Sequence, residues 1–289
     1  MLVAGVDFSG AKTVPNDTWL VTGELSSLGL KILSVKNTGS HALAHEIDQL
    51  KELSACGFDF PFSFPIEFLR FLARKLDRDE FQEWQEVAET MVFMDFDRLK
   101  QYVDEYEIVA PRFADTQSAR TAKSPLHQVN PSMVPMTFYG IRFLAMLNPD
   151  RYIVLPFQTD KKKNAASLIE VYPRELLYLF GLPDQGYKAK DKKNRDKAQA
   201  LKKDIVDGLI HLRERGDKKY EDCPRLHIDN SLKGAIIASD HAVDALVACC
   251  GAALFHSKPA LFPDPLASNN DNVLLEGWIY GPRKLAAAL

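Results

Sequence analysis

The amino-acid sequence predicts a mixed α/β fold, in which one sheet contains both antiparallel and parallel strands. Three strand-like segments, 2–7, 19–23 and 28–36, follow one another with Gly, Asn, Asp and Ser at the turns, which is typical of an antiparallel meander. Apolar residues then recur at helical spacing from Ser40, and a short apolar strand follows at 55–59. Because a helix between two strands requires a crossover connection, we expect this fourth strand to run parallel to the first.

A helical insertion is expected after the fourth strand. Over about residues 66–106, apolar side chains recur at helical spacing behind two prolines. The stretch 107–137 carries four prolines and little periodicity, which predicts a substrate loop or lid. We therefore interpret the chain as one domain, 1–289, with a helical and loop insertion at about 66–137.

The predicted architecture is one mixed sheet of five strands, drawn from six strand-like segments, with flanking helices. We expect a short helix at 138–147, strands at 152–157 and 168–173, and helices at 174–180, 194–215 and 239–256. The last of these helices is apolar on all sides, which is typical of a helix buried in the core.

The composition is that of a globular protein, because 46% of the 289 residues are hydrophobic and 26% are charged. It excludes a collagen, a disulfide scaffold and a disordered tail. The net charge of -3 provides no overall cationic field, so a nucleic acid would have to be bound by a local patch. The four cysteines lack CxxC spacing, the N-terminal segment lacks the basic region of a signal peptide, and no apolar run approaches about 18 residues. These features predict a cytoplasmic protein without a membrane span. They give no information about protein partners.

Asp244, within the last predicted helix, is the most informative residue. Every other residue of the run 242–255 is Ala, Val, Leu, Cys, Gly or Phe. Burying an unpaired carboxylate costs at least several kcal/mol, so this side chain requires a metal ion, an arginine or hydrogen bonds. Asp240 and His241 lie about one turn earlier and could converge on the same place. Alternatively, Ser239 and Asp240 only cap the helix.

Two further aspartates end predicted strands, Asp7 the first strand and Asp59 the fourth. Neighbouring strands lie about 4.8 Å apart, so two carboxylates at adjacent strand ends repel each other unless a cation lies between them. A single aspartate at a strand end is often only a turn residue. Taken together with Asp244, however, the two residues predict a site for a divalent cation, because hard cations prefer carboxylate oxygens.

Five short motifs are spread over nearly the whole chain. They are Gly5-Val-Asp-Phe-Ser-Gly, Phe58-Asp-Phe-Pro-Phe-Ser, Glu170-Val-Tyr-Pro-Arg-Glu, Ser239-Asp-His-Ala-Val-Asp-Ala-Leu and Glu276-Gly-Trp-Ile. In this order they resemble an uncharacterised family of predicted nucleases in the ribonuclease H-like superfamily. The last helix is also similar to that of RuvC-type Holliday-junction resolvases. The resemblance implies that the mixed five-stranded sheet is ribonuclease H-like.

The resemblance also implies a chemistry and a set of residues. It implies that Asp7, Asp59 and Asp244 are the acidic metal ligands, and that Glu170 and Asp240 are additional ligands or neighbours of the ligands. The implied reaction is hydrolysis of phosphodiester bonds in DNA or RNA with Mg²⁺ or Mn²⁺. Two such ions activate a water and stabilise the leaving oxygen, so a side-chain nucleophile is not required.

Basic residues outside the acidic set are candidates for proton transfer or phosphate contact. His241 is expected either to orient water and transfer a proton or to be a plain polar residue at the helix start. The candidate phosphate contacts are Lys12 after the first strand and Arg112, Arg120 and Lys123 in the long loop. The segment 188–203 contains eight Lys or Arg residues against two Asp, which indicates either a phosphate-binding patch or a solvated helix. Nucleic acid is therefore the predicted partner.

Two other functions stay open. The run Asp7-Phe-Ser-Gly-Ala-Lys also resembles the first phosphate loop of actin-like sugar kinases, which implies an ATP-dependent phosphotransferase. Those enzymes normally duplicate the core, and this chain leaves little room for two copies. The other alternative is a non-catalytic nucleic-acid-binding module that keeps the fold and a structural ion.

Overall fold

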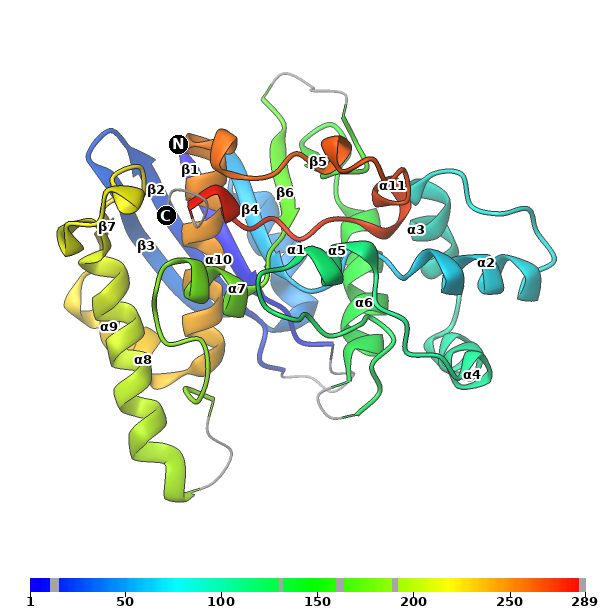
Figure 1. Cartoon of the computed structure of the whole chain (residues 1–289), viewed down its shortest axis with the longest axis horizontal. Coiled ribbons are helices and arrows are strands. Elements are labelled where there is room, and N and C mark those ends of the chain that lie inside the picture. The colour runs from blue at the N-terminus through cyan, green and yellow to red at the C-terminus, as the bar shows by residue number, and fades with distance from the viewer. Residues whose placement is uncertain (11–15, 130–131, 160–163, 189–191, 286–289) are drawn as a thin grey trace.

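A mixed sheet of seven strands, with helices on both faces, organises the protein (Figure 1). The computed structural model describes residues 1–10, 16–129, 132–159, 164–188 and 192–285. The strands are β1 (Leu2–Asp7), β2 (Trp19–Ser26), β3 (Gly29–Asn37), β4 (Leu53–Asp59), β5 (Tyr152–Val154), β6 (Ala166–Glu170) and β7 (Leu226–His227). Their order across the sheet is β5-β6-β4-β1-β2-β3-β7.

The pairing of the strands confirms the mixed α/β class. β1, β2 and β3 form the antiparallel meander, while β4 pairs parallel with the other side of β1, as the crossover argument predicted. β6 and β5 continue the parallel part, and β7 pairs parallel with β3. The predicted count of five strands is wrong. β5 lies within the segment 152–157 that was expected to be a strand, whereas β7 was not expected, because its two residues are too few for an alternation of apolar and polar residues.

The helices agree with the sequence pattern except around the predicted loop. They are α1 (Gly39–Gln49), α2 (Ile66–Lys75), α3 (Trp84–Phe93), α4 (Phe96–Tyr106), α5 (Phe113–Gln117), α6 (Met133–Met146), α7 (Pro173–Leu179), α8 (Arg195–Ile210), α9 (Asn230–Ala238), α10 (Asp240–Ser257) and α11 (Val273–Glu276). The loop predicted for 107–137 contains α5 and the first turn of α6. Pro135 lies in that first turn, where the missing N–H of a proline is tolerated. Outside that loop, the short helices α9 and α11 were also not predicted.

Alternating strand residues build two cores, one on each face of the sheet. Ala4 and Val6 of β1 face a core shared with α1 and the inserted helices α2, α3, α4 and α6. Val3 faces the opposite core, which α7, α8 and α10 cover. Figure 1 shows α10 lying in front of the sheet along β1 and β4.

Two glycines allow α10 to approach the sheet closely. A Cβ atom on Gly5 of β1 would lie 2.1 Å from the backbone nitrogen of Cys249, and one on Gly57 of β4 would lie 2.7 Å from the carbonyl oxygen of Ala248. Real Cβ contacts are not that short, so any larger residue would force the helix away. This close approach sets the distance between Asp244 of α10 and the ends of the two strands.

No single helix among the described residues is both long and apolar enough to cross a membrane. Together α9 and α10 have the length and composition of a span, but they are bent by 119° relative to each other.

Candidate metal centre

Three aspartates from distant parts of the chain meet at one edge of the sheet. One carboxylate oxygen each of Asp7, Asp59 and Asp244 lies within 4.8 Å of the other two. Asp7 and Asp59 are direct register partners at the ends of β1 and β4. Asp7 and Asp244 are buried and Asp59 is partly exposed. The expected meeting of these side chains is thus observed, and we refer to the three residues as the carboxylate cluster.

Both oxygens of Asp244 are contacted by two consecutive residues. The hydroxyl of Tyr187 donates a hydrogen bond of 2.7 Å to Oδ1, and the ammonium of Lys188 forms an ion pair with Oδ2. Tyr187 is buried, whereas the side chain of Lys188 is 50% exposed. The sequence indicated that Asp244 needs a counter-charge, but it did not indicate that Lys188 supplies it, because 56 residues separate the two.

His241 contacts Asp7, with 2.6 Å between Nδ1 and Oδ2. The hydrogen bond to Asp7 raises the pKa of His241 to about 9, so the ring is protonated at neutral pH and donates to the carboxylate. Asp240 is not part of the carboxylate cluster. The hydroxyl of Ser239 accepts a hydrogen bond of 3.3 Å from the backbone nitrogen of Ala242, as the capping alternative predicted for this serine.

Asp59 is the least compensated member of the carboxylate cluster. Within the part of the chain that the structure describes, its carboxylate has neither a hydrogen-bond nor an ion-pair partner. Burial, followed by repulsion from Asp7 and Asp244, raises the pKa of Asp59 well above its ordinary value. Burial also raises the pKa of Asp7. The carboxylate cluster therefore has an excess of negative charge and attracts cations.

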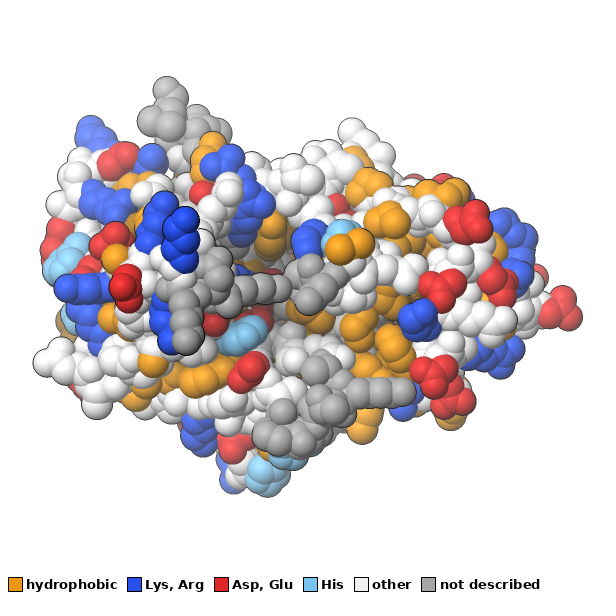
Figure 2. Space-filling model, turned by 90° about the horizontal axis from the view of Figure 1, so that it is seen from below, with side chains coloured by type: hydrophobic (Ala, Val, Ile, Leu, Met, Phe, Trp, Pro, Cys, Tyr) orange, Lys and Arg blue, Asp and Glu red, His pale blue; other side chains and the backbone are white. Residues whose placement is uncertain are grey.

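The carboxylate cluster is open to solvent through its partly exposed members. Asp59 is partly exposed, and the side chains of His241 and Lys188 are 40% and 50% exposed. Figure 2 looks onto the face where β1 ends, and it shows histidine and acidic side chains near the middle of that face, with Lys and Arg side chains gathered to one side. Cations and anionic substrates can therefore reach this edge of the sheet.

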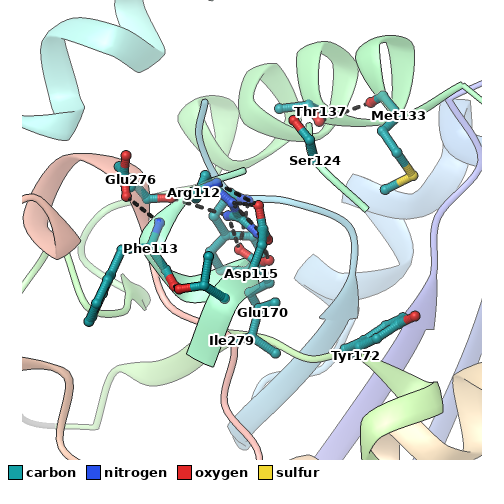
Figure 3. A network of polar contacts seen from close by, with 12 residues as sticks. Arg112, Phe113, Asp115, Ser124, Met133, Thr137, Glu170, Tyr172, Glu276 and Ile279 are labelled. Carbon is teal, nitrogen blue, oxygen red and sulfur yellow. Dashed lines mark hydrogen bonds and ion pairs between the residues drawn. The ribbon is translucent and has the colours of Figure 1, made fainter. Parts of the chain in front are cut away.

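Glu170, which the resemblance implies as a ligand or a neighbour of the ligands, belongs to a different set of contacts (Figure 3). Its two carboxylate oxygens accept hydrogen bonds of 2.5 and 2.8 Å from the guanidinium of Arg112. The backbone nitrogen of Phe62 donates a third, of 2.9 Å. A role as metal ligand is therefore not supported. Arg112 is only 1% exposed, so its expected contact with phosphate is wrong.

Asp115 and Glu276 complete this buried set, which we call the arginine network. Arg112 donates to Asp115 at 2.8 Å, and the two oxygens of Glu276 accept from the backbone nitrogens of Ile66 and Phe113 at 2.6 and 2.7 Å. The arginine network joins the start of α2, the start of α5 and the end of α11 to β6. All three of its carboxylates accept hydrogen bonds from Arg112 or from backbone nitrogens, which is a structural role.

The candidate phosphate contacts are dispersed. Arg120 forms an ion pair of 2.9 Å with Asp184 and lies 3.6 Å above the ring of Tyr178, so it is already engaged. Lys123 is exposed, and Lys12 lies outside the described residues. In the basic segment 188–203, residues 189–191 also lie outside the described part, and the cations described as exposed are Lys188, Lys193, Arg195, Lys197 and Lys203.

Comparisons with known protein families, with curated proteins and with solved structures find no match.

Proposed function

We propose that the protein is a nuclease of ribonuclease H-like fold that hydrolyses phosphodiester bonds in DNA or RNA and depends on Mg²⁺ or Mn²⁺. The observation that carries the proposal is the carboxylate cluster, in which oxygens from β1, β4 and α10 lie within 4.8 Å of one another. An all-carboxylate donor set suits hard divalent cations. The incomplete compensation of Asp59 favours the same ligand, because a cation would offset the burial and the repulsion that together raise its pKa.

The chain's own residues would bind the ions and control protons. Asp7, Asp59 and Asp244 would hold the metal, which when bound polarises a phosphoryl oxygen and lowers the pKa of water. His241 fixes the orientation of Asp7 through their 2.6 Å hydrogen bond. Because the ring of His241 is 40% exposed, it can also exchange a proton with solvent.

The topology supports the resemblance to ribonuclease H-like nucleases. The meander β1 to β3 is followed by the crossover helix α1 and the parallel strand β4, and both strand-end aspartates lie at the same edge. The motif Ser239 to Leu246 begins the helix that packs on these strands. The motif Glu170 to Glu175 supports the fold through the arginine network rather than through metal ligands.

A polyanionic substrate is supported by local cations, since the overall net charge is -3. Lys193, Arg195, Lys197 and Lys203 are exposed on and just before α8, and Lys188, from the same basic segment, reaches the carboxylate cluster. A nucleic acid backbone lying across these residues would pass the metal site. Its binding would weaken with salt, because each neutralised phosphate releases counterions.

Purified protein incubated with Mg²⁺ or Mn²⁺ and single-stranded, duplex and branched DNA and RNA tests the proposal. We expect cleavage that EDTA abolishes, and a loss of at least about a hundredfold in Asp7→Asn and in Asp244→Asn. Asp204→Asn, the same substitution at an exposed position of α8, is the matched control and should keep full activity. Unchanged cleavage in the two cluster variants would refute the site.

Two other results would replace the proposal. ATP consumption that depends on a small-molecule acceptor would favour a phosphotransferase. Salt-dependent nucleic-acid binding without turnover under any divalent metal would favour a binding module.

A further inference from the structure

Lys188 lies where a cation bound to the carboxylate cluster would be expected. Its ammonium contacts Oδ2 of Asp244, and its charge lowers the pKa of both Asp7 and Asp59. One amino group therefore acts on all three carboxylates, although Asp59 keeps a raised pKa in its presence. The contact places a positive charge inside a group of three acidic side chains.

The two residues that contact Asp244 differ in how firmly they are held. Tyr187 is buried in the core beneath α10, and its hydroxyl is fixed by the 2.7 Å hydrogen bond to Oδ1. Lys188 is 50% exposed, and among the described residues it forms one ion pair, with Asp244. A lysine side chain has four rotatable bonds and is strongly hydrated as a free ammonium. It can therefore leave Asp244 for solvent while Tyr187 stays in place.

An ammonium and a divalent cation compete for the same carboxylate oxygens. When all three aspartates are ionised they carry three negative charges, of which Lys188 balances one and the protonated His241 balances another. A dication brings twice the charge of an ammonium to oxygens that it prefers as ligands. One oxygen of Asp244 lies within 4.8 Å of an oxygen of each of the other two carboxylates, and the ammonium of Lys188 contacts Oδ2 of the same carboxylate.

We propose that Lys188 is a built-in counter-cation of the carboxylate cluster, and that a divalent ion binds there by displacing Lys188 from Asp244. This inference rests on the proposed metal site but not on the reaction that the site performs. It assigns Lys188 a regulatory role, since the lysine sets the metal concentration at which the site fills. Metal binding would also release an ammonium at the opening of the site.

Metal binding to Lys188→Gln tests the displacement directly. Free Mn²⁺ is measured by electron paramagnetic resonance during titration of protein that has been treated with a chelator and desalted. We expect Lys188→Gln and Lys188→Met to bind Mn²⁺ about tenfold more tightly than the unaltered protein, because the competing charge is gone. Lys51→Gln, an exposed lysine after α1, makes the same change in net charge and should leave the affinity unaltered.

A second measurement uses the unaltered protein, so it does not depend on a variant that folds. Brief acetylation followed by mass spectrometry reports how readily each lysine reacts. We expect Lys188 to react slowly in EDTA and several-fold faster in saturating Mn²⁺, while Lys51 reacts equally in both. Unchanged or slower reaction of Lys188 in Mn²⁺ would overturn the proposal.

The outcomes separate this inference from the proposed function. Equal or weaker Mn²⁺ binding by the Lys188 variants, with binding still abolished by Asp7→Asn, would keep the metal site and reject displacement. No Mn²⁺ binding by any of the proteins would reject both. Tighter binding by the Lys188 variants without cleavage of any nucleic acid would support displacement and reject the nuclease.

Discussion

The protein contains two groups of acidic side chains that are largely buried, and they are compensated in opposite ways. In the arginine network, Glu170 receives two hydrogen bonds from a guanidinium that is 1% exposed. In the carboxylate cluster, Asp59 has no hydrogen-bond or ion-pair partner within the described ranges, and the basic groups beside Asp7 and Asp244 are 40% and 50% exposed. In the arginine network every carboxylate accepts hydrogen bonds from Arg112 or from backbone nitrogens, whereas in the carboxylate cluster Asp59 has no such donor within the described residues.

This difference separates structural carboxylates from carboxylates that can bind a ligand. A buried ion pair with satisfied hydrogen bonds has no capacity left for a further cation, and removing one partner leaves an uncompensated charge. The carboxylate cluster, in which the pKa of Asp59 stays raised, would still be stabilised by a bound cation. Burial and acidity alone would not have distinguished Glu170 from Asp7, because both are buried. The identity of the partner distinguishes them.

Replacing the central cation of the arginine network should have the largest effect. We expect Arg112→Ala to lower the free energy of unfolding by about 3–5 kcal/mol, because it leaves Glu170 and Asp115 buried without their partner. Urea denaturation measures the change. Arg213→Ala, at an exposed position, is the control and should change stability by less than about 0.5 kcal/mol. A comparably small effect of Arg112→Ala would show that the arginine network is not held by this pairing.

Displacing α10 should damage the carboxylate cluster without altering any of its residues. Gly5→Ala would put a Cβ atom 2.1 Å from the backbone of Cys249, so the helix must move. We expect a loss of about 1–3 kcal/mol in unfolding free energy and weaker Mn²⁺ binding in calorimetric titration. Gly234→Ala on α9 has open space around it and should leave Mn²⁺ binding unaltered. Normal Mn²⁺ affinity in Gly5→Ala would mean that the metal site does not depend on this approach.

Neutralising the uncompensated carboxylate should stabilise the protein in EDTA. We expect Asp59→Asn to raise the free energy of unfolding by about 1 kcal/mol, because it removes repulsion from Asp7 and Asp244. The same variant should lose Mn²⁺ binding. Asp115→Asn provides the contrasting case, since it weakens a paired carboxylate and should destabilise. Urea denaturation of Asp59→Asn that shows a loss of stability would contradict the difference between the two groups.

The raised pKa of Asp59 predicts how the stabilisation expected for Asp59→Asn depends on pH. Above its folded-state pKa this residue is ionised and the repulsion is fully present. As the pH falls through the raised pKa toward the ordinary value of 3.8, the folded state takes up the proton first, so the repulsion is relieved. The stability gap between Asp59→Asn and the unaltered protein in EDTA should therefore be largest above the raised pKa and shrink as the pH falls through it. A gap that widens toward pH 4 would contradict the sign of the shift.

The sequence alone determined the elements that carry the candidate site. The turn residues and the apolar spacing predicted the meander, the crossover helix and the parallel fourth strand, because these depend on local periodicity and on the handedness of connections. Parallel pairing then placed Asp7 beside Asp59, and a lone charge in an apolar helix marked Asp244. These inferences needed no knowledge of distant contacts.

Only the tertiary structure decided which basic side chain pairs with which carboxylate. Arg112 and Glu170 are 58 residues apart and Lys188 and Asp244 are 56 apart, and no local pattern relates the members of either pair. The sequence placed Arg112 among possible phosphate contacts and Glu170 near a metal, whereas the fold joins them in one buried ion pair. A short edge strand such as β7 was missed for the same reason, since its two residues pair with β3 through contacts that lie far apart in the chain. Periodicity is a property of neighbours in sequence, but charge compensation is a property of neighbours in space.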